Sequence, residues 1–266
     1  MSDGRRRARG STPPSIGAKN LGREDPAALR ARARRVARAL ADTYPDAWCA
    51  LRHESAWQLL VATILSAQCT DERVNLVTPA LFSRFSTPAA LAAAPPAEIE
   101  ALIRSTGFFR QKTKALRTVA GAIASRYGGE VPRELETLVT LGGVGRKTAN
   151  VVLGTAYGVP AIMVDTHVRR VARRLGLTEE DDPEKIERDL QRLLPPAEWT
   201  HFSHRLIHHG RRICIARRPR CPHCPLLRFC PQVGVIVTET RAEEGASRSP
   251  GARRRKTPRD RRRPRR

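Results

Sequence analysis

The sequence predicts an all-α fold, and two observations support this fold class. Apolar residues recur with the spacing of a helix face through most of residues 26–213, and we find no convincing strand. Proline, glycine and capping residues separate these helical stretches. No sequence repeat of about 20–50 residues indicates a solenoid. The 266 residues suffice for one large domain or two small domains, each with its own core.

Helices are expected along most of the chain. The first covers residues 27–43, carries arginines around an apolar face, and is stopped by Pro45. Residues 55–68 form the most apolar helix, which we expect in the middle of a core. Asp71 is expected to cap the next helix, which runs to residue 82 and can kink at Pro79. Further helices are expected to begin at residue 87 and to cover residues 96–106, 111–127, 134–140, 148–157, 165–175, 183–194 and 197–213.

The composition indicates a polyanionic partner. The chain has 49 basic and 26 acidic residues and a formal net charge of +23. The terminal segments 1–25 and 238–266, which we expect to be disordered basic tails, contribute +3 and +8, so residues 26–237 carry the remaining +12. The folded part should therefore itself attract a polyanion, although a basic protein without such a partner is the alternative.

The sequence gives no sign of a membrane or secreted protein. No apolar run reaches the ~18 residues of a membrane span, so we expect no membrane partner. Arg5, Arg6 and Arg7 are not followed by the apolar segment of a secretory signal. The arginine-rich stretch 253–266 suits either a DNA-contacting arm or a nuclear targeting signal.

Residues 134–157 predict two short helices joined by a glycine-rich turn. Three glycines, Gly142, Gly143 and Gly145, lie in this turn, where they allow positive φ and close approach of another backbone. The first amides of the second helix lack intrahelical partners and carry its positive dipole end, so the turn can hold one phosphate. A plain turn is the commoner interpretation. Lys147 follows in the first turn of the second helix, where the dipole favours a neutral, nucleophilic amine.

Four of the six cysteines lie close together near the end of the folded part. Their spacing is Cys-x6-Cys-x2-Cys-x5-Cys, and they are Cys214, Cys221, Cys224 and Cys230. Such a group more often binds metal than forms disulfides. The spacing suits a [4Fe–4S] cluster, with zinc as the alternative. The other two, Cys49 and Cys69, are expected to be packing residues.

These segments resemble the endonuclease III family of DNA glycosylases. The stretch 141–149 is similar to the helix-hairpin-helix motif of that family, 164–167 to its catalytic aspartate segment, and 65–71 to its early signature helix. The four clustered cysteines match its iron–sulfur loop. The resemblance covers roughly residues 26–237 and leaves out both tails. One departure is Gly142, where the family usually has proline.

The resemblance implies two helical lobes with the active site between them. One lobe would hold residues 48–158, including the helix-hairpin-helix at 134–158, and the other residues 26–47 and 159–237 with the cluster. The cluster would have a structural role. Its loop would present Arg217, Arg218 and Arg220 to DNA phosphates.

The resemblance also implies a reaction. Lys147 would attack the sugar C1′ of a damaged nucleotide, expel the base and form a Schiff base, and β-elimination would then cut the strand 3′ to the abasic site. Asp165 would assist this step. Gln68 would enter the gap left by the flipped base, and Phe108 would act as a wedge. The DNA-contacting residues of the hairpin would be Gly143, Gly145 and Arg146.

The expected partner is double-stranded DNA with oxidised pyrimidines or abasic sites, bound by a monomer. In a bacterium the protein would be cytoplasmic and associated with the nucleoid, and a nuclear location is the alternative. Three other functions remain open. They are a mismatch glycosylase without lyase activity, a non-catalytic iron–sulfur protein that binds DNA or transfers electrons, and a zinc-binding nucleic-acid module.

Overall fold

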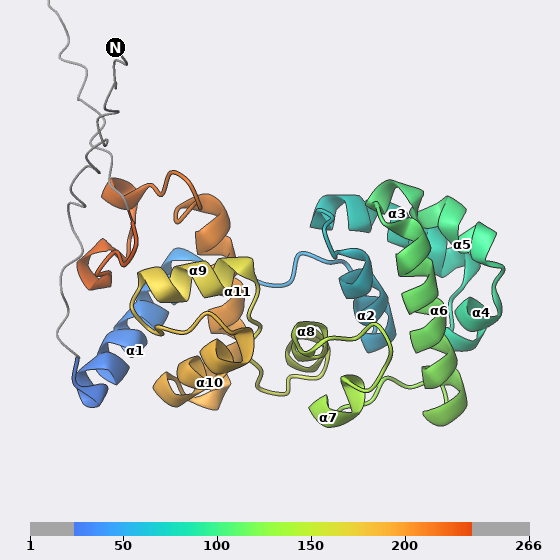
Figure 1. Ribbon diagram of the computed structural model, residues 1–266, viewed down its shortest axis with the longest axis horizontal. Helices are drawn as coiled ribbons and strands as arrows, with labels where there is room; N and C mark the ends of the chain where they lie inside the picture. The colour runs from blue at the N-terminus through green and yellow to red at the C-terminus, as the bar shows by residue number, and fades with distance from the viewer. Residues whose placement is uncertain (1–23, 236–266) are drawn as a thin grey trace, which may run out of the picture.

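The computed structural model describes residues 24–235, and these residues form helices with no strand among them (Figure 1). The predicted tails cover residues 1–25 and 238–266, and all of them except residues 24 and 25 lie outside the described residues, as do residues 236–237. The helices are α1 (Pro26–Thr43), α2 (Ala56–Leu65), α3 (Asp71–Arg84), α4 (Pro88–Ala93), α5 (Pro96–Ile103), α6 (Phe109–Arg126), α7 (Leu135–Leu138), α8 (Arg146–Ala156), α9 (Thr166–Arg174), α10 (Pro183–Leu193) and α11 (Trp199–Arg212). Short 3-10 turns are η1 (Arg104–Thr106), η2 (Pro196–Glu198), η3 (Cys221–His223) and η4 (Leu227–Phe229).

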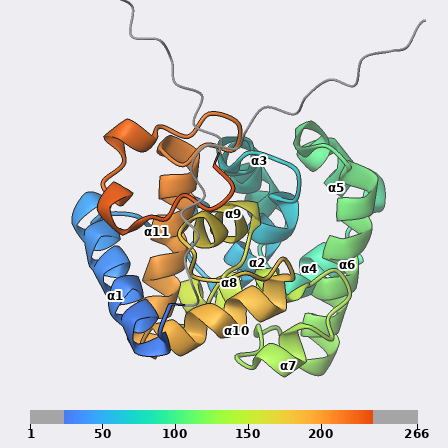
Figure 2. The ribbon, with the colours of Figure 1, turned by 60° about the vertical axis from the view of Figure 1, so that its left-hand side comes forward.

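The helices form two groups, each around its own apolar core. Helices α2 to α8 surround one core, and α1 and α9 to α11 surround the other (Figures 1 and 2). In α2, eight of ten residues are buried, so this helix is central to its core as its composition predicts. The buried residues of one core lie between Leu51 and Met163, and those of the other lie between Ala33 and Ala47 and between Ile162 and Leu226.

The segment between α8 and α9 contributes to both cores. Ile162 and Val164 pack into the core of α1 and α9 to α11, whereas Met163 packs into the core of α2 to α8. Successive side chains of this segment therefore point to opposite sides, as they do in a strand. The segment therefore joins α8, which carries Lys147, to Asp165 while contacting both halves of the molecule.

Several predicted boundaries differ from the structure by two or three residues, and three of the differences concern caps or a candidate site residue. Thr70, not Asp71, caps α3: the Thr70 side chain accepts a hydrogen bond from the Arg73 amide, and Asp71 occupies the first turn. Helix α2 ends at Leu65, so Gln68 lies in the following turn. Asp25, assigned to the tail, caps α1 by accepting hydrogen bonds from two amides of its first turn. The starts of α3 and α1 are each set by the side chain that accepts hydrogen bonds from the first amides. Where two neighbouring side chains can both accept, the sequence does not show which one forms the cap.

Candidate active site

The hairpin, which we define as α7, the turn 139–145 and α8, is fixed by its glycines. Gly143 has a φ of 93°, and a β-carbon there would lie 2.9 Å from the β-carbon of Ala115 on α6. A β-carbon on Gly142 would lie equally close to Thr118 of the same helix, so the turn is pressed against α6. Gly145 is different, because nothing lies within 4 Å of the corresponding position.

The amino end of α8 is open. Gly145 is its N-cap and supplies no side-chain hydrogen bond to the first amides. These amides, which are orphaned in any helix, have no side-chain acceptor here, and a phosphate oxygen could accept from them. Lys147, the second residue of α8, has an exposed side chain at this end.

Lys147 and Asp165 line one pocket, although they belong to different groups of helices. Asp165 is the N-cap of α9 and its side chain is 20% exposed. Both groups of helices and the connection at residues 48–51 contribute residues to the pocket. Its lining includes Trp48, Cys49, Thr63, Ser66, Asp71, Val151, Met163, His204, His208 and Arg211.

Asp165 is held as an anion in a fixed orientation. Its Oδ1 accepts hydrogen bonds from the amides of His167 and Val168, both at 2.8 Å, and its Oδ2 lies 3.1 Å from the Nδ1 of His167. Burial raises the pKa of Asp165, but the hydrogen bonds and the positive charges of His167 and Lys147 outweigh it, so the pKa lies below its usual value. The carboxylate can therefore accept a proton or stabilise a positive charge in the pocket.

His204 is a pocket residue that the sequence analysis missed. It is 5% exposed on α11, and the indole of Trp48 packs against its ring and against that of His201, with centroid distances of 4.9 and 4.8 Å. Burial lowers the pKa of His204 to about 4, and the charges of His208, His201 and Lys147 add to this effect. Its imidazole is therefore neutral near pH 7. The spacing of His201, His204 and His208 on one helical face was the available signal.

An ion pair closes one side of the same pocket. The guanidinium of Arg211 on α11 donates to the carboxylate of Asp71 on α3 at 2.9 Å. The two residues are 140 positions apart, so no local pattern pointed to their contact. The pair connects the two groups of helices beside Lys147 and Asp165.

Arg146, predicted to contact DNA, has a partner within the protein. Its guanidinium donates two hydrogen bonds to Glu187 of α10, at 2.8 and 2.9 Å, and the Glu187 side chain is 5% exposed. The hydrogen bond to Glu187 raises the pKa of Arg146. The pair thus ties the first residue of α8 to the other lobe, and it leaves the Arg146 side chain 39% exposed.

Gln68 and Phe108 occupy two turns with unusual backbone conformations. Their φ values are 53° and 48°, in the left-handed region that few residues other than glycine adopt. Both side chains point to solvent, and Phe108 is 56% exposed although it is aromatic. Gly107, with a φ of 71°, precedes Phe108 and completes the turn before α6.

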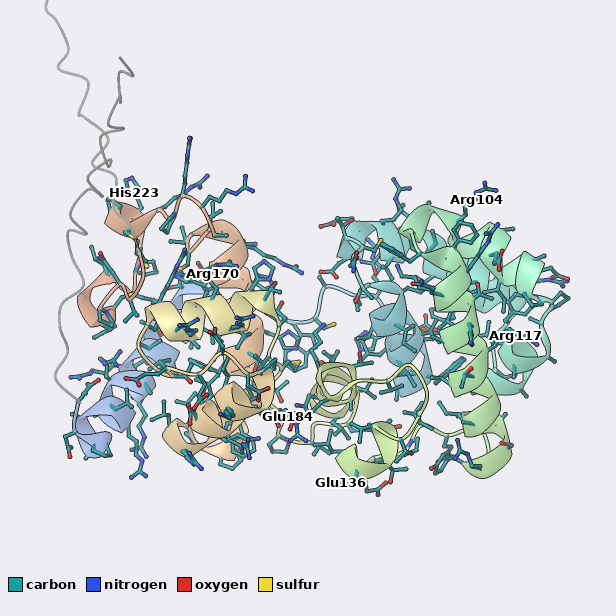
Figure 3. The ribbon with its side chains drawn as sticks, in the orientation of Figure 1. Arg104, Arg117, Glu136, Arg170, Glu184 and His223 are labelled. Carbon is teal, nitrogen blue, oxygen red and sulfur yellow. The ribbon has the colours of Figure 1, made fainter. Side chains whose placement is uncertain are left out.

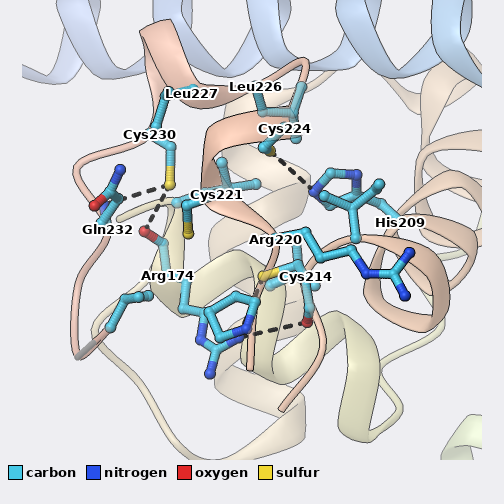
Figure 4. Close-up of a pocket in the computed structure, with 15 residues that line it drawn as sticks. Arg174, His209, Cys214, Arg220, Cys221, Cys224, Leu226, Leu227, Cys230 and Gln232 are labelled. Atoms are coloured by element: carbon cyan, nitrogen blue, oxygen red, sulfur yellow. Dashed lines mark hydrogen bonds between the residues drawn. The ribbon is translucent and has the colours of Figure 1, made fainter. Parts of the chain in front are cut away.

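The four clustered cysteines line a second pocket, between α9, α11 and the loop after α11 (Figure 4). Arg174 of α9 donates to the carbonyl groups of Ile215 and Ala216 and so holds the loop in place. Arg170, which is labelled on α9 in Figure 3, donates to the carbonyl groups of Gly210 and Cys214. Burial raises the pKa of the Cys230 thiol to about 11.

The shape of this pocket bears on what could bind there. No three His, Cys, Asp or Glu side chains within residues 24–235 come close enough to one point to hold a single metal ion. The four sulfur atoms instead surround a space, which fits the donor set of a polynuclear cluster. His223, which lies between two of the cysteines in sequence, is not among the lining residues. The side chains of Arg217, Arg218 and Arg220 are exposed on the same loop.

Comparison with known proteins identifies the family. Residues 61–196 match the family described as HhH-GPD superfamily base excision DNA repair protein. Endonuclease III from Synechocystis sp. is 52% identical over 206 residues, which is 77% of this chain and 94% of that protein. Endonuclease III from Bacillus subtilis is 47% identical over 192 residues, covering 72% of this chain and 88% of the relative.

A solved structure gives the same result. The structure of a trapped endonuclease III–DNA covalent intermediate has a TM-score of 0.73 and 45% sequence identity, and the match covers 76% of this chain and 95% of the other. The predicted resemblance, the all-α fold and the enzyme class of DNA glycosylase with abasic-site lyase activity are thereby confirmed. The chain belongs to the HhH-GPD superfamily of base excision DNA repair proteins and, within it, to the endonuclease III family.

Proposed function

We propose that this enzyme removes oxidised pyrimidines from double-stranded DNA, acting as a monomer, and that Lys147 is its nucleophile. The observation that carries the proposal is that Lys147 and Asp165, from different lobes, line one pocket. An amine and an ionised carboxylate in a shared pocket are the two groups that a glycosylase with lyase activity needs.

The chemical steps follow from these two groups. The lone pair of the Lys147 amine forms a bond to the sugar C1′, and the bond from C1′ to the base breaks, so the base leaves with its electron pair and takes up a proton. Opening of the sugar ring converts the new bond into a protonated Schiff base. Loss of a proton from C2′ then expels the oxygen at C3′ and cuts the strand. Hydrolysis of the imine restores the amine.

Asp165 contributes a proton acceptor and a negative charge. Its Oδ1 is occupied by two main-chain amides, which leaves Oδ2, shared with His167, as the oxygen directed to the reaction. A carboxylate held this way can take the proton of an attacking amine and stabilise the positive charge that develops on the sugar. The carboxylate does not have to reorient during the reaction, because its hydrogen bonds to the first amides of α9 already fix it.

DNA would be held from two sides. The amide of Gly143 and the open amides after Gly145, with the exposed edge of Arg146, would contact a phosphate next to the damaged nucleotide. Gln68 and Phe108 would enter the base stack. The arginines of the cysteine loop, Arg217, Arg218 and Arg220, would contact phosphates further along.

The cysteine pocket would hold a [4Fe–4S] cluster with Cys214, Cys221, Cys224 and Cys230 as ligands. Its contribution is structural, because the pocket lies away from Lys147 and Asp165 and shapes the arginine-bearing loop. Iron and sulfide analysis of the purified protein should give about four of each per chain, with broad visible absorbance. Stoichiometric zinc without iron would contradict this proposal.

Borohydride trapping tests the nucleophile. Wild-type protein, abasic duplex DNA and borohydride should give a covalent complex through reduction of the Schiff base, and Lys147→Ala should give none while retaining DNA binding. Lys114→Ala, an exposed lysine on α6, is the control and should trap normally. Undiminished trapping by Lys147→Ala would contradict the assignment, and glycosylase activity without trapping in the wild type would favour a monofunctional enzyme.

A further inference from the structure

Lys112 is a buried lysine outside the pocket of Lys147 and Asp165. It lies in the first turns of α6 and is 5% exposed. Its ammonium group donates hydrogen bonds to the main-chain carbonyl oxygens of Leu65 and Thr106, each at 2.8 Å. Neither partner is a carboxylate, so this buried charge is not explained as an ion pair. Burying a charged group is costly, and here main-chain dipoles alone compensate it.

The two carbonyl groups are the ends of two helices. Leu65 is the last residue of α2, and Thr106 is the last residue of η1. Terminal carbonyls of helices have no intrahelical partner and carry the negative end of the dipole, which favours a cation. The Lys112 ammonium satisfies both ends and fixes the distance between them, although Leu65 is 47 positions away in sequence.

Each of these helix ends leads directly to an exposed side chain with a left-handed backbone. Gln68 follows Leu65 by three residues, and Phe108 follows Thr106 by two. Among residues 24–235, the non-glycine residues with positive φ are these two and Gln232. Such a conformation is unfavourable at a residue with a β-carbon, and it persists where surrounding contacts impose it.

We propose that Lys112 is a positioning residue for base extrusion, because it holds the turns of Gln68 and Phe108 at a fixed separation so that both enter the duplex together. The proposal rests on the proposed roles of those two side chains in DNA. Without the shared ammonium, the two turns would be free to shift independently. Each would then have to be ordered during binding, at the moment when the base pair is being opened.

The experiment separates base extrusion from chemistry. The variants are Lys112→Gln and Lys112→Met, and Lys114→Met on the exposed side of the same helix is the matched control. Single-turnover cleavage is measured on one oxidised pyrimidine placed either in a fully paired duplex or in an internal loop of unpaired bases. Extrusion costs less from the loop, since no pair has to be broken.

The Lys112 variants should lose tenfold or more in rate on the paired duplex, a loss of about 1.4 kcal/mol or more in transition-state stabilisation, and change little on the loop. Lys114→Met should match the wild type on both. An equal loss on both substrates would mean that Lys112 supports only the fold, and no loss on either would show that it is dispensable. Either result overturns the proposal.

A second comparison tests the proposal if Lys112→Gln and Lys112→Met fold poorly. Lys112→Arg keeps the charge but places its donors further from α6, and it is combined with Gln68→Ala and Phe108→Ala together. If Lys112 acts through these side chains, the arginine substitution should slow paired-duplex cleavage in the wild type but not in the double-alanine background. Equal effects in both backgrounds would overturn the proposal. A wild-type enzyme that cleaves neither substrate would instead contradict the proposed function.

Discussion

Asp165 performs two tasks with one carboxylate, since it caps α9 and lines the pocket of Lys147. Asp165→Asn should separate these tasks, because the amide oxygen can still accept the hydrogen bonds from His167 and Val168. We expect DNA binding close to that of the wild type and a chemical step slower by about 10²–10⁴-fold. Fluorescence anisotropy and single-turnover cleavage measure the two quantities. A parallel loss of both would indicate an architectural role instead.

His204 makes stability depend on pH. Its pKa in the folded protein is about 4, whereas an unfolded histidine titrates near 6.5, so only the unfolded state takes up this proton between these values. The contribution of His204 to the free energy of unfolding is fully present above pH 6.5. It is lost as the pH drops toward 4, by roughly 3 kcal/mol in total. Denaturant unfolding at pH 7 and pH 4.5 should show a smaller loss for His204→Gln than for the wild type. An identical loss would rule out this source.

The active-site residues differ in how far they could be predicted. Local sequence offered Lys147 as a candidate, because it follows three glycines within a few positions, whereas Asp165 was expected only from the resemblance of residues 164–167 to the endonuclease III family. The contact of Lys112 with Leu65, the Asp71–Arg211 pair and the Arg146–Glu187 pair each join residues at least 41 positions apart. Such contacts depend on how the helices pack, and no periodicity in the chain encodes them.

At the level of elements, the hairpin contains two glycines with different purposes. Gly143→Ala should lower the free energy of unfolding by ~2 kcal/mol or more, because alanine is strained at a φ of 93° and would press on Ala115. Gly145→Ala has neither conflict, so it should fold with a change of at most ~1 kcal/mol. It should nevertheless weaken DNA binding, because its methyl group lies where the phosphate is proposed to sit.

Thermal unfolding and binding to abasic duplex DNA measure both effects. If Gly145→Ala binds like the wild type, the open amides of α8 do not contact phosphate.

The helices themselves were largely predictable from apolar spacing, and errors were confined to their ends. At α3, for example, Thr70 and Asp71 are adjacent acceptors, and only the backbone geometry of the cap shows which one is used.

For the whole molecule, charge should govern non-specific binding to DNA. Deleting residues 238–266 removes twelve basic and four acidic residues. We expect weaker binding to undamaged duplex and a shallower dependence of log affinity on log salt concentration, because fewer counterions are released. Cleavage at a lesion in low salt should be nearly unchanged. An unaltered slope would show that this tail does not contact DNA.

The side chains of residues 162–164 pack alternately into the two cores, and this limits how the segment can change during evolution of the enzyme. Met163 is anchored in one half of the protein, and its two neighbours are anchored in the other. Inserting or deleting a single residue there would invert which side chains face which half. The segment that joins the amine of Lys147 to the carboxylate of Asp165 must therefore keep its length, because a change of one residue would reverse the direction of its side chains.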